Sequence, residues 1–249
     1  HKDAPEGFSH YFAVLLKPVE KGTSIAGELE KAFGDSWVDS AGTMRAFIGK
    51  VRAENGTEYE YDLFVAEVPS GLDISTSFSG SQDQYPEPPE GVRIRRLTRG
   101  MHVSGIVRGS SDGTRIAFAA RDENGIDQVF IKQVRKSEIP PLRATGLKSP
   151  ASSIRWHPSG EWIFFISDGN LFVTYVGARR KFGKTVRLSD DRLERDQLVV
   201  SHDGASLACV IPVPTRDSTG KEVKDASGKD FRQIFMVDLD WKKIEDASE

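Results

Sequence analysis

Ser111-Asp112-Gly113-Thr114-Arg115-Ile116-Ala117-Phe118 is the stretch of sequence that decides the fold. Asp and Gly suit a tight hairpin turn, because Asp bonds its own backbone and Gly accepts a positive φ. The apolar run that follows the turn is typical of a β-strand. The stretch therefore predicts a β-hairpin, and similar stretches recur along the chain.

Three tripeptides, each with Arg first and a hydroxyl residue last, precede a turn glycine by the same distance. They are Arg96-Leu97-Thr98, Arg143-Ala144-Thr145 and Arg187-Leu188-Ser189, and the glycines are Gly113, Gly160 and Gly204. The gap from hydroxyl residue to glycine is 15 residues in all three, and successive units lie 47 and 44 residues apart. An earlier, more divergent copy has its turn at Ser40-Ala41-Gly42. Repeats of about 45 residues with four short strands are the signature of propeller blades.

We therefore expect an all-β fold, a β-propeller of four-stranded blades, with about four blades in this chain and a larger ring as an open alternative. The predicted blades are 38–98, 99–145, 146–189 and 190–249. A Pro-rich insert at 69–91 predicts an extended loop, and the polar segment 212–231 predicts a long hairpin. No fourth strand is evident in the last blade, so either a strand from elsewhere completes it or it stays incomplete.

Residues 1–37 are expected to finish a preceding blade. Phe12-Ala13-Val14-Leu15-Leu16 predicts a strand. Ser24–Phe33 predicts a short helix, because Ile25, Leu29 and Phe33 have helix-like spacing.

Composition excludes some classes of function. Lys and Arg total 34 against 37 for Asp and Glu, which leaves a net charge of −3 and no basic surplus for nucleic acid. No stretch approaches the ~20 apolar residues of a membrane span, so no transmembrane segment is expected. The single Cys209 lies in the apolar run Leu207–Ile211, which predicts a buried strand residue.

Two motif matches fit hairpins better than catalytic or phosphate-binding sites. Gly109-Ser110-Ser111-Asp112-Gly113 has the spacing of a nucleophile elbow, but it lies between two predicted strands instead of between a strand and a helix. Gly177–Thr185 approaches a phosphate-binding loop, but it is one residue too long and no helix follows. Its basic residues form either a solvated loop or a local anion-binding patch. The histidines lack metal-ligand spacing, so no catalytic residue, metal or cofactor is predicted.

The repeat resembles the TolB-type, WD40-like propeller repeat, also called PD40, and Ser111–Phe118 carries the likeness most closely. Ser36-Trp37-Val38, the Pro-rich insert and the order of the blades resemble the C-terminal part of an uncharacterised bacterial family labelled TolB-like or biopolymer-transporter-like. The resemblance implies a longer protein with further blades before His1. It also favours a periplasmic or otherwise extracytoplasmic location, with the cytoplasm as the alternative. It brings no catalytic residues.

The candidate site is the mouth of the central channel, where the entry ends of the innermost strands are expected to cluster. The predicted site residues are His102, Ser104, Ser152, Ser153, Arg192, Arg195 and Asp196. We predict a non-enzymatic module that binds a protein, peptide or glycan there, and a merely water-filled channel is the alternative for this region.

A polysaccharide-active propeller enzyme, similar in architecture to oligogalacturonide lyase, is the alternative function. A divalent ion bound near His102 would favour it. A propeller that gates a prolyl-oligopeptidase-like hydrolase would need a separate α/β catalytic domain, for which these 249 residues contain no candidate segment.

Overall fold

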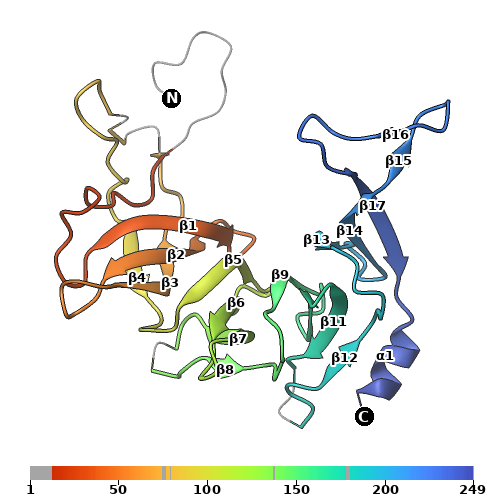
Figure 1. Cartoon of the computed structure of the whole chain (residues 1–249). Coiled ribbons are helices and arrows are strands. Elements are labelled where there is room, and N and C mark those ends of the chain that lie inside the picture. The colour runs from red at the N-terminus through yellow and green to blue at the C-terminus, as the bar shows by residue number, and fades with distance from the viewer. Residues whose placement is uncertain (1–12, 75–76, 79, 137, 178–179, 249) are drawn as a thin grey trace. The chain divides into compact units, whose positions relative to one another are not determined.

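The computed structural model describes residues 13–248, apart from 75–76, 79, 137 and 178–179 (Figure 1). Antiparallel β-sheets make up most of this part of the chain. The chain divides into two compact units, of which the first holds residues up to Ala120 together with Lys132–Pro141. The second holds Arg121–Ile131 and the residues from Leu142 onward.

The first unit contains a sheet with the order β1-β2-β3-β4. Its strands are β1 (Leu29–Trp37), β2 (Met44–Arg52), β3 (Tyr59–Glu67) and β4 (Arg93–Arg96). Phe47 lies opposite Phe64 in the β2–β3 register, and their rings stack with centroids 5.5 Å apart. Aromatic pairs across antiparallel strands stabilise such a sheet.

A second sheet, ordered β5-β6-β7-β8, has its strands divided between the two units. The strands are β5 (Val103–Gly109), β6 (Arg115–Arg121), β7 (Asp127–Gln133) and β8 (Leu142–Arg143). The hairpin predicted from Ser111–Phe118 is confirmed as the β5–β6 turn, in which Asp112 accepts a hydrogen bond from the backbone N of Thr114 at 3.0 Å.

The second unit contains two further sheets, ordered β12-β11-β10-β9 and β13-β14-β17. Their strands are β9 (Ser152–Trp156), β10 (Trp162–Ser167), β11 (Asn170–Tyr175), β12 (Thr185–Arg187), β13 (Asp196–Val200), β14 (Ser206–Val213) and β17 (Phe231–Asp238). The predicted polar hairpin between β14 and β17 carries a small ribbon of β15 (Thr215–Arg216) and β16 (Glu222–Val223). Helix α1 (Trp241–Ala247) follows β17.

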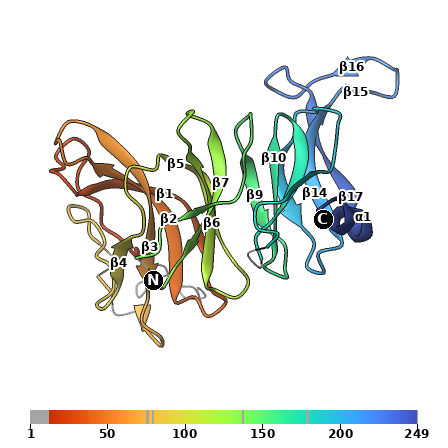
Figure 2. The ribbon, with the colours of Figure 1, turned by 90° about the horizontal axis from the view of Figure 1, so that it is seen from below.

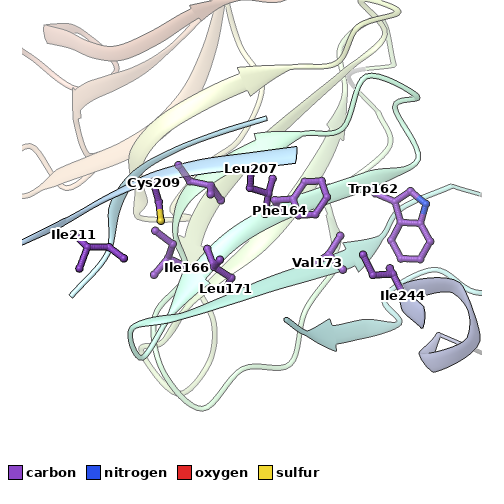
Figure 3. Close-up of a cluster of buried hydrophobic side chains, with 10 residues drawn as sticks. Trp162, Phe164, Ile166, Leu171, Val173, Leu207, Cys209, Ile211 and Ile244 are labelled. Carbon is purple, nitrogen blue, oxygen red and sulfur yellow. The ribbon is translucent and has the colours of Figure 1, made fainter. Parts of the chain in front are cut away.

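The core of the second unit lies between these two sheets. Figure 3 shows Phe164, Ile166, Leu171 and Val173 facing Leu207, Cys209 and Ile211, all buried. Ile244 from α1 covers one end of this cluster beside Trp162 (Figure 3). Figure 2 shows α1 next to β14 and β17. Cys209 is therefore the buried strand residue that its apolar neighbours predicted.

The recurring Arg-x-hydroxyl tripeptides have one structural role in three sheets, at the ends of β4, β8 and β12. Each hydroxyl oxygen accepts a hydrogen bond from a third-strand backbone N, at 2.9–3.0 Å; the pairs are Thr98 with Leu63, Thr145 with Val129, and Ser189 with Leu171. Each arginine Nε donates to the carbonyl oxygen of the hydroxyl residue two positions later, at 2.8–3.0 Å. The tripeptide thus anchors the outer strand to its sheet, and this explains why it recurs.

A buried polar residue in the third strand, immediately before the residue that the hydroxyl caps, holds the loop that leads to the next blade. Asp62, Gln128 and Asn170 are at most 2% exposed. Gln128 accepts hydrogen bonds from the Thr145 hydroxyl and the backbone N of Leu147, both at 2.8 Å. Asp62 and Gln128 thus each join a strand, its neighbour and the following loop, and Asn170 holds the following loop by accepting from Arg192 N at 3.1 Å.

Two expectations for the N-terminal region are wrong. Residues Leu29–Trp37 form a strand that pairs with β2, so the helix predicted over Ser24–Phe33 is absent and this segment belongs to the first described sheet instead of a preceding blade. Residues four apart share a face in a strand as well as in a helix, so the spacing of Leu29 and Phe33 does not distinguish the two. Two irregularities in the β1–β2 register also interrupt the alternation that would have indicated a strand. Phe12 lies outside the described residues, and the rest of the strand predicted there, 13–16, is not a strand.

Candidate functional site

A bulge with a left-handed residue occurs in the first strand of each of the four large sheets that the structure describes. The residues are Gly34 (φ 62°), Gly105 (φ 73°), Ser153 (φ 52°) and Gln197 (φ 53°), each within an irregularity of the register. Bulges of this kind bend a strand and redirect its side chains. Ser153 and Gln197 adopt this conformation without being glycine, which costs free energy that only the surrounding structure can offset.

The second unit brings two of the predicted site residues together beside these bulges. The Ser153 hydroxyl donates to Asp196 Oδ1 at 3.3 Å, and the Gln197 backbone N donates to the same oxygen at 2.7 Å. Arg232 Nη2 donates to Asp196 Oδ2 at 3.0 Å. We call Ser153, Asp196, Gln197 and Arg232 the Asp196 cluster.

The Asp196 cluster is charged and exposed to solvent. About half of the side chain is exposed in both Asp196 (55%) and Arg232 (51%). The hydrogen bond from Arg232 lowers the pKa of Asp196, with further lowering from the backbone of Gln197 and the Ser153 hydroxyl. The carboxylate is therefore ionised at neutral pH, and the cluster offers both charges and a hydroxyl to a ligand.

Arg192 forms a second exposed pair close in sequence to the Asp196 cluster. Its Nε lies 3.3 Å from Asp168 Oδ2, and the two side chains are 70% and 55% exposed. Both residues have left-handed backbones, with φ 50° and 47°. A Cβ on Gly169 would approach the carbonyl carbon of Arg192 to 2.8 Å, so only glycine allows this close contact between the two loops.

Arg195 links the two loops through a buried side chain. Its side chain is 6% exposed, and its guanidinium donates to Gly169 O at 2.6 Å and to both carboxylate oxygens of Asp191 at 2.5 and 2.6 Å. These hydrogen bonds, which Arg195 donates, lower the pKa of Asp191 and raise the pKa of Arg195. Ser152 pairs with Ile166 inside its sheet, where its hydroxyl lies 3.4 Å from Ile166 O.

His102 and Ser104, two further predicted site residues, belong to the first unit. His102 is exposed, has φ 51° and lies immediately before β5. Asp62 holds the segment before it by accepting from Gly100 N at 3.1 Å and Met101 N at 3.2 Å. Ser104 is half-buried and pairs with Ala119.

The structure adds residues that sequence reasoning missed. Arg232 follows a polar hairpin and meets Asp196 only because β14 pairs with both β13 and β17. Asp168 lies in a loop 24 residues before Arg192, so no local pattern connects that pair, whereas Asp191 lies only four residues before Arg195. Among the described residues, no group of three or more His, Cys, Asp or Glu side chains is arranged to hold a metal ion.

The first unit also has a hollow that sequence reasoning did not predict. A cavity of about 480 Å³ lies against sheet β1–β4, lined by 13–16 and by Phe33, Phe47 and Tyr85. Leu15 and Leu16 pack there on the cluster around Phe47 and Phe64. This hollow is therefore part of the way the segment 13–16 covers one face of the sheet.

No protein-family model matches the chain. The chain is 31% identical over 218 residues to YidR of Escherichia coli strain K12, an uncharacterised protein, and the match covers 80% of this chain and 50% of YidR. The chain therefore spans about half the length of that curated relative.

Solved structures with a TolB fold are similar to this one. A TolB-like protein of Agrobacterium tumefaciens matches with a TM-score of 0.51 and 14% identity, over 86% of this chain and 78% of that chain. TolB of Acinetobacter baumannii matches with a TM-score of 0.48 and 16% identity, over 82% of this chain and 43% of that chain. The predicted all-β, TolB-like propeller fold is confirmed. No helix in the described part of the chain has the length and apolar character needed to cross a bilayer.

Proposed function

We propose that this chain is a non-enzymatic propeller module that binds a protein partner through the Asp196 cluster and the neighbouring Arg192–Asp168 pair. The observation that carries the proposal is the gathering of backbone strain at this surface. Among the described residues of the second unit, four that are not glycine have left-handed backbones, and all four belong to these two groups: Ser153, Asp168, Arg192 and Gln197.

The left-handed backbones of these four residues do not stabilise the fold, so their occurrence together needs another explanation. Left-handed backbones cost stability, and exposed ion pairs return little of it, typically about 0–1 kcal/mol. The Asp196–Arg232 and Arg192–Asp168 pairs are both exposed, so neither is suited to compensate for the strain. Strained residues cluster at binding sites in many proteins, because their geometry is part of recognition.

The chemistry of the surface fits a polar protein interface. It presents carboxylates, guanidinium groups and a hydroxyl within two adjoining loops and strands, so a partner of complementary charge could pair with both signs. The buried side chain of Arg195 fixes the positions of the two loops, because it donates hydrogen bonds to both Asp191 and Gly169. The surface is therefore preorganised and does not need to order itself on binding.

Site-specific photo-cross-linking tests the proposal. A photoreactive residue replaces Arg192, which is 70% exposed, and in a second protein it replaces Lys242 on α1 as the control. Cross-linking in extract from the native organism should yield a partner band from position 192 and none from 242. The partner is then purified, and its affinity is measured for the wild type and for Asp196→Ala and Arg232→Ala.

We expect each of these variants to bind the purified partner about tenfold more weakly, because removing one member leaves the other charge without its pair. Asn124→Ala, an exposed amide in a turn of another blade, should bind like the wild type. Unchanged affinity in both Asp196→Ala and Arg232→Ala would contradict the proposal. Binding of a glycan in place of a protein would contradict the choice of partner.

The resemblance to TolB supports an extracytoplasmic location as part of this proposal. Fractionation of cells that express the complete native protein with a C-terminal tag tests the location. Recovery of the tag in the periplasmic or extracellular fraction is expected, and recovery in the cytoplasm alone would contradict it.

A further inference from the structure

β17 forms the outer edge of a sheet that has three strands, whereas the other three large sheets each have four. In the described part of the chain no strand pairs with its outer side, as Figure 1 shows. All eight residues of β17 are exposed, whereas most residues of the equivalent third strands β3, β7 and β11 are buried. β17 therefore differs from its counterparts because no outer strand among the described residues pairs with it and none of its residues is buried.

The exposed surface of β17 is apolar. Ile234 is 76% exposed and Met236 is 74% exposed, and Val199 on the same face of the sheet is 47% exposed. An edge strand of this length and apolar character is a template for pairing with another strand. Charged residues interrupt it only near its two ends, at Arg232 and Asp238.

The sequence of β17 matches the segments that receive an outer strand in the other blades. Gln233-Ile234-Phe235 aligns with Asp62-Leu63-Phe64, Gln128-Val129-Phe130 and Asn170-Leu171-Phe172. In those blades the middle residue's backbone N donates to the hydroxyl of the Arg-x-hydroxyl tripeptide, and its carbonyl accepts from the tripeptide's central backbone N at 2.7–2.8 Å. The phenylalanine lies opposite the arginine in all three registers.

Gln233 lacks the partners that its counterparts have. Gln128 is buried and accepts from the Thr145 hydroxyl at 2.8 Å. Gln233 is exposed, and its amide nitrogen lies 3.4 Å from the hydroxyl of Thr215 in the hairpin. The donor at Ile234 and the acceptor at Gln233 are thus in place for a strand that the described residues do not supply.

We propose that β17 binds an extended segment that ends in Arg-x-Thr or Arg-x-Ser and that lies outside residues 1–249 in a longer polypeptide. The segment runs antiparallel to β17, with its arginine opposite Phe235 and its hydroxyl at Ile234 N. The relative YidR, of which this chain spans about half, supports a source in additional chain of the same protein. The proposal is independent of the proposed partner at the Asp196 cluster.

Residue-resolved hydrogen exchange on the full chain tests this proposal. The probe is a synthetic peptide with the sequence of residues 184–190, which contains β12 and its Arg187-Leu188-Ser189 ending. In β11 the backbone N of Leu171, the counterpart of Ile234, points toward the outer strand β12. The backbone N of Ile234, and that of Met236 two residues later, should therefore point toward the free edge of β17. The amides of Phe235 and Val237 alternate with them and point toward β14.

Saturating peptide should slow exchange at Ile234 and Met236 at least tenfold, and Phe235 and Val237 should change little. Peptides with Arg187→Ala or Ser189→Ala should bind about fivefold more weakly, because each loses one hydrogen-bonding group of the tripeptide. Gln233→Ala should weaken binding of the unchanged peptide, whereas Asn124→Ala should not.

Three results would overturn the proposal. One is equal slowing at all four amides, and another is equal affinity for the peptide and its Ser189→Ala form. The third is slow exchange at Ile234 without peptide, accompanied by a dimer in light scattering, which would assign the edge to a second copy of the chain.

Discussion

Glu30 is the residue whose surroundings make stability depend most clearly on pH. Its side chain is 2% exposed and accepts hydrogen bonds from the Ser24 hydroxyl at 2.5 Å and the Tyr59 hydroxyl at 2.7 Å. The hydrogen bond from Ser24 contributes most, followed by that from Tyr59, and they lower the pKa of Glu30 from 4.5 to about 2. Because the folded pKa lies below the unfolded one, the stabilising contribution is complete above about pH 4.5 and is lost as the pH falls toward 2.

Glu30→Gln should therefore lower the free energy of unfolding near neutral pH and flatten its decline between about pH 4.5 and pH 2. Urea unfolding at a series of pH values measures both effects. Glu54→Gln, at an exposed position, is the control and should keep the wild-type pH dependence. The same acid slope in Glu30→Gln and the wild type would show that Glu30 does not carry the effect.

Thr145 tests the role of the hydroxyl at the end of an outer strand. It accepts from Val129 N at 3.0 Å and donates to Gln128 Oε1 at 2.8 Å, and all three residues are buried. Thr145→Val keeps the shape but leaves the buried backbone N of Val129 without its acceptor and removes one of the two hydrogen bonds to Gln128 Oε1, so the free energy of unfolding should fall by about 1–3 kcal/mol. Thr145→Ser retains the hydroxyl and should lose much less. Equal losses in the two variants, measured by urea unfolding, would assign the role of Thr145 to packing.

Among the elements, the short helix α1 stabilises the second unit by packing on the end of its core. Trp241 packs against Trp162 and Phe164 and donates from its Nε1 to Gly204 O at 3.0 Å. Ile244 is 4% exposed within the same core cluster. Ile244→Ala should therefore lower the free energy of unfolding by about 2–4 kcal/mol through the lost apolar contacts and the cavity left behind.

Lys242→Ala on the exposed side of α1 is the matched control and should change the free energy of unfolding by less than about 0.5 kcal/mol. Urea unfolding followed by tryptophan fluorescence measures both variants. Similar stabilities for Ile244→Ala and Lys242→Ala would mean that α1 is not docked in solution.

Elements with local turn chemistry could be predicted from the sequence, and elements fixed by distant contacts could not. The Ser110–Gly113 and Ser201–Gly204 turns bond themselves, through Ser110 with Asp112 and Ser201 with Asp203, so their sequences predict hairpins. β1 was misjudged because its bulges follow from pairing with β2, which the local spacing of apolar residues does not reveal. α1 was missed although Asp240 caps it by accepting from Lys243 N at 3.2 Å, a local signal that could have been found.

At the scale of the whole molecule, repetition made the fold predictable and left the site largely unpredicted. The spacing of the tripeptides predicted the blades because each blade uses the same anchor. The candidate site depends instead on features that differ between blades, such as the contact of Asp196 with Arg232 from the strand after the long hairpin. Ser153 and Asp196 were predicted and do meet, whereas Arg195 was predicted to face a ligand and is buried under the loops.

The exposed edge of β17 should govern how the chain behaves at high concentration. Ile234 and Met236 present apolar side chains beside unpaired backbone groups, which is the arrangement that leads to association between edges. Met236→Lys places a charge in the middle of this edge, so the onset of aggregation should move to a higher concentration or temperature. Static light scattering during a thermal ramp measures the onset, and urea unfolding shows whether stability has changed. Thr219→Lys, in the exposed turn of the hairpin, adds the same charge away from the edge and should leave the onset near that of the wild type. An equal shift in both variants would attribute the effect to net charge and contradict a role for β17.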